Sequence, residues 1–218
     1  MKHRSLRRPI LFVMVLFGAG LAMALAGFTP QIPAQAAETA ESDELRFPDE
    51  PPKEPDGYKL DKYRSIVPTS LKGAIVVSDK EAMALHESGE VVFIDVMPFV
   101  PRPPNLPEGM IWRDKKRSNI PHSMWLANVG YGRLPPEMDE YFRRHLAKVT
   151  GAETKTPVLF YCQKDCWMSW NAAKRALEYG YERIYWYPDG TDGWASIGGE
   201  LEAATPLPLP NMTRPLNN

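Results

Sequence analysis

The two cysteines of the 218-residue chain lie four positions apart, at Cys162 and Cys166, so any thiol chemistry of this protein must use them. They follow an apolar run, 157–161, that predicts a strand, and they precede a segment, 167–179, that predicts a helix. A thiol between a strand and a helix start meets backbone N–H groups and the positive helix end, which lower its pKa and make it reactive. The sequence therefore predicts a thiol site in the loop 162–167.

Several chemistries are open to this cysteine pair. A disulfide between Cys162 and Cys166 stiffens the loop, or serves thiol redox chemistry in which Cys162 attacks and Cys166 resolves. Sulfur transfer needs only Cys162, which would carry the sulfur as a persulfide. Two thiolates at this spacing also suit Cu(I), with His122 as the candidate third ligand. A c-type haem is excluded because the sequence lacks Cys-x-x-Cys-His, and zinc would lack ligands.

The other loop residues are the candidate substrate-binding residues: Gln163, Lys164, Asp165 and Trp167. Lys164 and the loop N–H groups favour a thiolate at Cys162, whereas the carboxylate of Asp165 opposes it.

Two carboxylates outside the loop are candidate supporting residues. Asp95 lies in the apolar run 91–97, and Asp189 follows the predicted strand 183–187. In an open α/β sheet the site lies beyond the carboxyl ends of the strands, so both residues are expected near Cys162. We expect Asp95 to accept hydrogen bonds from backbone donors and Asp189 to shape the turn beside the pocket.

Strand and helix patterns alternate along the chain and define the elements that position these residues. The predicted strands are 73–78, 91–97, 157–161 and 183–187, and the predicted helices are 79–87, 135–149 and 167–179. This order predicts an α/β fold, a three-layer domain with a mostly parallel central sheet flanked by helices. The proline-rich loop 98–119 is too long for a plain connection, which indicates a functional segment or an insertion.

The ends of the chain predict an exported protein. Residues 1–36 have the basic start, short apolar run and Ala-x-Ala ending of a signal peptide, with cleavage expected after Ala36. We expect a proline- and acid-rich linker at 37–57, the domain at 58–200 and a proline-rich tail at 201–218. Cleavage removes four positive charges and no negative ones, which changes the formal net charge from -1 to -5. No basic face then favours nucleic acid, and no stable membrane span is expected after cleavage.

A family resemblance rests on landmarks that occur in a fixed order: Phe93–Val96, Asn119–Ser123, Val158–Cys162, Ala172–Tyr181, and Ile184–Trp194. Over roughly residues 73–200 the sequence resembles a rhodanese-like domain. That resemblance implies a rhodanese fold and thiosulfate sulfurtransferase-like or thiol-redox activity at Cys162. Three positions depart from the usual rhodanese pattern. Asp165 and His122 stand where glycine is common, and Trp167 stands where an arginine often lies.

A narrower resemblance involves Cys162–Asn171, Pro101–Asn105, Gly130–Gly132 and Tyr185–Trp194. These phrases are similar to the secreted CXXCW-motif proteins associated with catabolism through pyrroloquinoline quinone (PQQ) dependent dehydrogenases. The resemblance implies a periplasmic accessory protein, with a PQQ-dependent alcohol dehydrogenase or its electron acceptor as partner. PQQ enters only by this association, and copper is the other candidate cofactor. Three classes of function stay open: a thiol-redox or sulfur-transfer enzyme, a copper or cofactor carrier, and a non-catalytic interaction module.

Overall fold

The computed structural model describes residues 50–103 and 105–211. The predicted signal peptide, and most of the predicted linker, lie outside these residues. In the described part of the chain, no helix combines the length and the apolar character that crossing a membrane requires.

A five-stranded, entirely parallel sheet organises the domain, in the order β1-β6-β5-β2-β4. Its strands are β1 (Ile75–Val76), β2 (Val92–Asp95), β4 (Met124–Trp125), β5 (Val158–Tyr161) and β6 (Ile184–Tyr187). The central strand β5 is buried along its whole length, because helices cover both faces of the sheet. The predicted α/β fold with a mostly parallel sheet is confirmed.

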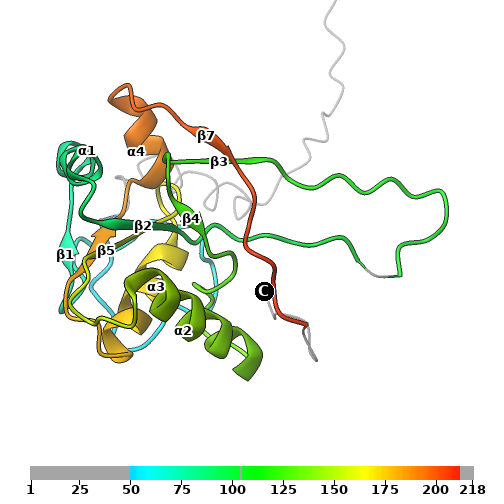
Figure 1. Ribbon diagram of the computed structural model, residues 1–218, viewed down its shortest axis with the longest axis horizontal. Coiled ribbons are helices and arrows are strands. Elements are labelled where there is room, and N and C mark those ends of the chain that lie inside the picture. Colours follow the sequence, from blue (N-terminus) through cyan, green and yellow to red (C-terminus); the bar gives the residue numbers. More distant parts are fainter. Residues whose placement is uncertain (1–49, 104, 212–218) are drawn as a thin grey trace, which may run out of the picture. The chain divides into compact units, whose positions relative to one another are not determined.

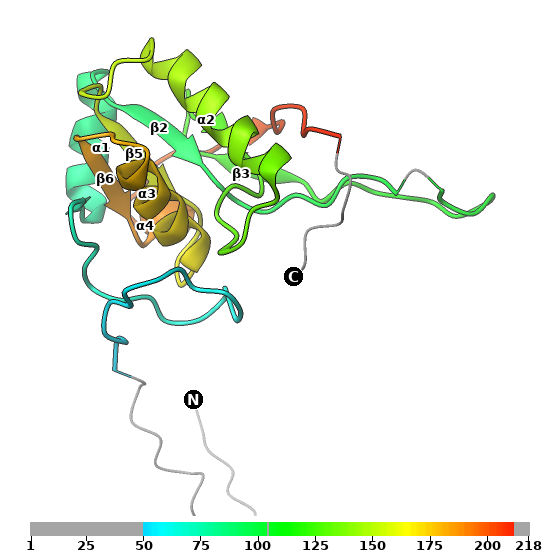
Figure 2. The same cartoon turned by 90° about the horizontal axis from the view of Figure 1, so that it is seen from below.

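The helices divide between the two faces of the sheet (Figures 1 and 2). On one face, α2 (Pro136–Thr150) and α3 (Trp167–Glu178) pack on the larger core cluster, which Trp170 and Phe142 help to fill. On the other face, α1 (Asp79–Ser88) and α4 (Gly190–Ser196) pack on a smaller cluster. Gly89 and Gly151 end α1 and α2 in the left-handed conformation, so sequence patterning placed these two helix ends well.

A second, two-stranded antiparallel sheet joins the long loop to the C-terminal segment. It consists of β3 (Arg117–Asn119) and β7 (Glu202–Ala204). Beyond β7, Leu207 and Leu209 pack against the larger core, and the Leu207 N–H donates to the Trp125 carbonyl oxygen (3.0 Å). In residues 201–211, the described part of the predicted proline-rich tail, two leucines therefore pack on apolar surface and the backbone pairs with β3.

The loop between β2 and β3 leaves the sheet and returns to it (Figure 1). It carries three strongly exposed apolar side chains, Val100, Met110 and Ile111. The base of this loop lies beside the cysteine pair, as the lining of the cavity described below shows.

Candidate active site

The two cysteines form a disulfide in the loop between β5 and α3. Cys162 directly follows β5, Cys166 is the residue before α3, and their Cα atoms are 6.3 Å apart. Both are buried, with 0% of Cys162 and 1% of Cys166 exposed. Asp95 pairs with Tyr161 in neighbouring strands, so the disulfide lies at the carboxyl edge of the sheet, where the sequence placed it.

Two loop N–H groups are already bound by acceptors of the protein. The Lys164 N–H donates to a carboxylate oxygen of Asp192 (3.1 Å), and the Trp167 N–H donates to the carbonyl oxygen of Tyr63 (2.9 Å). Arg64 donates to the Lys164 carbonyl oxygen (2.5 Å). The chain around Tyr63 and Arg64 thus lies across the loop, and Tyr63 and Asp192 each accept one loop N–H that would otherwise be free for an anionic sulfur.

Asp165 adopts a left-handed backbone conformation, with φ of 54°. Glycine enters this region without cost, and aspartate is among the few other residues that tolerate it. Asp165 can therefore form the same turn as the glycine that is common at this position in rhodaneses, and it adds a negative charge to the loop.

Trp167 lies in the core rather than at a substrate surface. Only 3% of it is exposed, and its ring N–H donates to Ser65 Oγ and to the Ile66 carbonyl oxygen, both at 3.1 Å. Near it, the Asn171 side chain bonds the backbone N–H and carbonyl of Lys59 (3.0 and 2.9 Å). Trp167 and Asn171 therefore anchor the segment that covers the cysteine loop.

A buried ion pair between Arg117 and Asp95 holds the cysteine loop at the Cys162 carbonyl. The Arg117 Nε lies 2.7 Å from Asp95 Oδ2, and its Nη2 donates to the Cys162 carbonyl oxygen (2.8 Å). The other Asp95 oxygen accepts the Met97 N–H (2.9 Å), as expected for a carboxylate that satisfies backbone donors. Burial raises the pKa of Asp95 above its usual value, and the Arg117 guanidinium partly offsets this rise. The sequence did not indicate this role, because Arg117 is the last residue of a basic run in the long loop (Arg113, Lys115, Lys116 and Arg117).

The backbone at Gly190 and Thr191 packs closely against the Cys162 carbonyl. The Thr191 N–H donates to the Cys162 carbonyl oxygen (3.2 Å). A Cβ at the preceding residue, Gly190, would lie 2.7 Å from that oxygen, and its φ is +50°. Glycine is therefore required at this turn, which agrees with the expected structural role of the segment after β6.

Asp189 supports the loop only at its edge. Its carboxylate lies 3.9 Å from Lys164 Nζ, and both side chains are substantially exposed. Burial, followed by the nearby Asp79 carboxylate, raises the pKa of Asp189, and Lys164 partly offsets this. The structure gives Asp189 no contact with either cysteine sulfur among the interactions of the described residues.

A cavity of about 460 Å³ opens beside the disulfide, and Cys166 rather than Cys162 lines it. Its lining is apolar and basic, without an acidic side chain among the described residues that form it: Tyr63, Arg64, Met97, Pro98, Val100, Trp112, Arg113, Lys115, Gln163, Cys166 and Met168. Of the predicted substrate-binding residues, only Gln163 faces this space. The cavity can hold a small anionic molecule against the Cys166 side of the disulfide.

His122 does not join the cysteine pair. It lies two residues before Met124, which pairs with Ile94, so it is near the amino end of β2 and the cysteines are beyond the carboxyl end. There its ring stacks on His86, with centroids 6.2 Å apart. In the described part of the chain, no three His, Cys, Asp or Glu side chains form a group that could hold a metal ion. The ligand set Cys162, Cys166 and His122 is therefore not assembled.

The site is therefore a disulfide between a strand and a helix at the carboxyl edge of a parallel sheet. The family model described as Rhodanese-like domain matches residues 78–197, and the chain belongs to this family. A comparison with curated proteins found no significant match.

Two solved structures illustrate the likeness. Thiosulfate sulfurtransferase from Pseudomonas aeruginosa is 15% identical, with a TM-score of 0.42 over 64% of this chain, and this chain spans 22% of that protein. The polysulfide-sulfur transferase homodimer from Wolinella succinogenes is 22% identical, with a TM-score of 0.38 over 59% of this chain and 78% of that chain.

Proposed function

We propose that this protein is an exported dithiol–disulfide redox protein that acts as an accessory to PQQ-dependent alcohol oxidation in the periplasm. The observation that carries the redox part is the disulfide beside the cavity, which Cys166 lines although both cysteines are almost fully buried. The PQQ part is supported by the sequence resemblance of the cysteine loop and its neighbours.

The reaction is a thiol–disulfide exchange. A substrate thiolate in the cavity attacks Cys166 Sγ, the Cys162–Cys166 bond breaks, and Cys162 leaves as a thiolate. A second substrate thiolate attacks the substrate sulfur of the mixed disulfide, which releases a substrate disulfide and the Cys166 thiolate. Two electrons pass from two substrate thiols to the protein, and an oxidised low-molecular-weight disulfide can restore the bond by the reverse exchange. Cys166 is thus the attacked residue and Cys162 the leaving group, which reverses the roles that the sequence suggested for the two cysteines.

Rhodanese-type sulfur transfer is less favoured by this loop. A persulfide on Cys162 needs N–H donors for its negative charge, and the N–H groups of Lys164 and Trp167 point to Asp192 and Tyr63 instead.

The basic lining predicts a preference for negatively charged thiols. The oxidised protein should react about tenfold faster with mercaptoethanesulfonate than with cysteamine of matched thiolate concentration, and added salt should reduce the ratio. Replacing Arg113 and Lys115 together by glutamine should abolish most of the preference, because both side chains line the cavity. The measurement is the single-turnover rate of free thiol appearance.

The matched control for this experiment is Lys116→Gln, which removes an exposed charge that does not line the cavity. Equal rates for the two thiols would contradict the proposed substrate site. In a parallel sample, reduced protein is incubated with thiosulfate. A mass increase of about 32 Da, with sulfite release, would identify a sulfur carrier and overturn the redox assignment.

Export is the second testable part of the proposal. Sequencing the N-terminus of the protein from the periplasmic fraction should give Ala37, because signal peptidase cleaves after Ala-x-Ala. Recovery of the intact chain from the membrane fraction would show an uncleaved anchor instead. The partner that we propose is a periplasmic PQQ-dependent alcohol dehydrogenase or its electron acceptor.

A further inference from the structure

We propose that the reduced Cys162–Cys166 pair binds one Cu(I) ion, with the thioether of Met97 as the third ligand. This metal site goes beyond the redox function, because copper binding needs the dithiol but no electron transfer through it. His122, the third ligand that the sequence suggested, lies at the other end of the sheet.

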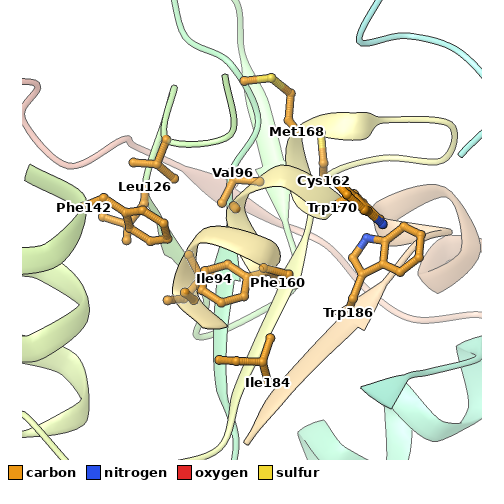
Figure 3. Packing of buried hydrophobic residues seen from close by; sticks show 14 of the residues in the cluster. Ile94, Val96, Leu126, Phe142, Phe160, Cys162, Met168, Trp170, Ile184 and Trp186 are labelled. Atoms are coloured by element: carbon orange, nitrogen blue, oxygen red, sulfur yellow. The ribbon is translucent and has the colours of Figure 1, made fainter. Parts of the chain in front are cut away.

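The position of Met97 carries the proposal. Its Sδ lies 3.5 Å from Cys162 Sγ, and its side chain lines the same cavity as Cys166. Because Cys162 Sγ is bonded to Cys166 Sγ, three soft sulfur atoms lie close together beside the cavity. Figure 3 shows Cys162 with other buried residues of the larger core cluster, among them Trp170 and Met168.

The backbone of Met97 is held on both sides, which fixes where its thioether can reach. Its N–H donates to Asp95 Oδ1 (2.9 Å), and its carbonyl oxygen accepts the ring N–H of Trp125 (2.7 Å). Asp95 is in turn held by Arg117, which also binds the Cys162 carbonyl oxygen. The same buried ion pair thus positions the methionine and the first cysteine relative to each other.

The ligand chemistry selects Cu(I). Thiolate and thioether ligands are soft and suit Cu(I), which accepts two or three of them. Zinc takes four ligands from Cys, His, Asp and Glu, and no three of these come together in the described part of the chain.

Charge and proton balance agree with this assignment. One Cu(I) ion displaces the protons of two thiols, and the resulting complex of two thiolates, one thioether and one Cu(I) carries a net charge of −1. Arg64, Arg113 and Lys115 line the cavity and offset that charge. A dithiol reductant must first supply two electrons to open the disulfide, after which copper binds without changing its oxidation state.

The test titrates reduced, desalted protein anaerobically with the Cu(I)–bicinchoninate complex. Wild type should remove one Cu(I) per chain from the chelator. Met97→Leu should weaken binding by at least about tenfold, since losing even an outer-shell partner of a metal site costs about 10–100-fold. The matched control is Met110→Leu, which changes a strongly exposed methionine of the long loop and should bind as wild type. Cys162→Ser should lose tight binding.

X-ray absorption at the copper edge gives a second readout that does not depend on a variant. The wild-type complex should show a shell of three sulfur atoms, and Met97→Leu should show two. A two-sulfur shell in wild type, or equal affinities for wild type and Met97→Leu, would overturn the role of Met97. Failure of the reduced wild type to compete with bicinchoninate would overturn the site as a whole.

Discussion

Replacing Arg117 by glutamine is expected to lower the free energy of unfolding by about 3–5 kcal/mol, the usual cost of removing one partner of a buried ion pair. Asp95 is fully buried, and the Arg117 side chain is only 11% exposed. The variant leaves the Asp95 carboxylate without its counter-charge and the Cys162 carbonyl oxygen without its shortest hydrogen bond. Urea unfolding of the variant and wild type at about pH 7 measures the difference.

This loss of stability should depend on pH in a defined direction. Burial already raises the pKa of Asp95, and removing the Arg117 guanidinium should raise it further. A carboxyl whose pKa is raised by folding binds its proton more readily in the folded state, so acidification favours that state. The deficit of Arg117→Gln relative to wild type should therefore be full at neutral pH and should shrink as the pH falls through the raised pKa of Asp95.

Two further variants make this prediction specific to the ion pair. Lys116→Gln removes a neighbouring exposed charge and should change stability by less than about 0.5 kcal/mol. Asp95→Asn combined with Arg117→Gln should recover part of the loss, because the uncompensated charge is gone. A deficit for Arg117→Gln no larger than that of Lys116→Gln, or one that grows as the pH falls, would refute the role assigned to the pair.

Changing either cysteine to serine is expected to abolish thiol oxidation, and with it the contribution of the protein to growth on an alcohol that requires a PQQ-dependent dehydrogenase. The exchange reaction needs a leaving group at Cys162 and an attacked sulfur at Cys166, so neither single variant retains it. A sulfur carrier would need only Cys162, and Cys166→Ser would then keep its activity. The growth phenotype of each variant, together with its rate of thiol oxidation, separates the two functions.

Stability must be measured beside function for the same variants. A disulfide that closes a five-residue loop removes little chain entropy, and its loss should cost about 2 kcal/mol. The Cys162→Ser/Cys166→Ser double variant is the control, because it lacks the disulfide and has no free thiol. If the single variants have melting temperatures near that of wild type and support normal growth, the cysteines are not required for the function. The non-catalytic interaction module is then the better description.

The sequence by itself determined the fold class and the location of the thiol loop. Continuous apolar runs, helical periodicity and glycine stops are local signals, and they placed the central strands and α1, α2 and α3 within a few residues. The alternation of these elements implied a parallel sheet, and a parallel sheet implied that Cys162 and Asp95 would meet at its carboxyl edge. The family landmarks followed the same order, and the family model confirmed the rhodanese-like domain over residues 78–197.

Only the tertiary structure decided what surrounds the cysteines. Arg117 reaches Asp95 across 22 positions, and the Tyr63 carbonyl oxygen reaches the Trp167 N–H across about a hundred. The local pattern of apolar residues does not predict such contacts, because they depend on where the loops return to the sheet. Strand register places His122 at the opposite end of the sheet, and the fold of the loop makes Cys166 a lining residue of the cavity. The side chain beside Cys162 Sγ is thus the thioether of Met97. Hydrogen bonds between the Met97 backbone and the side chains of Asp95 and Trp125 position it.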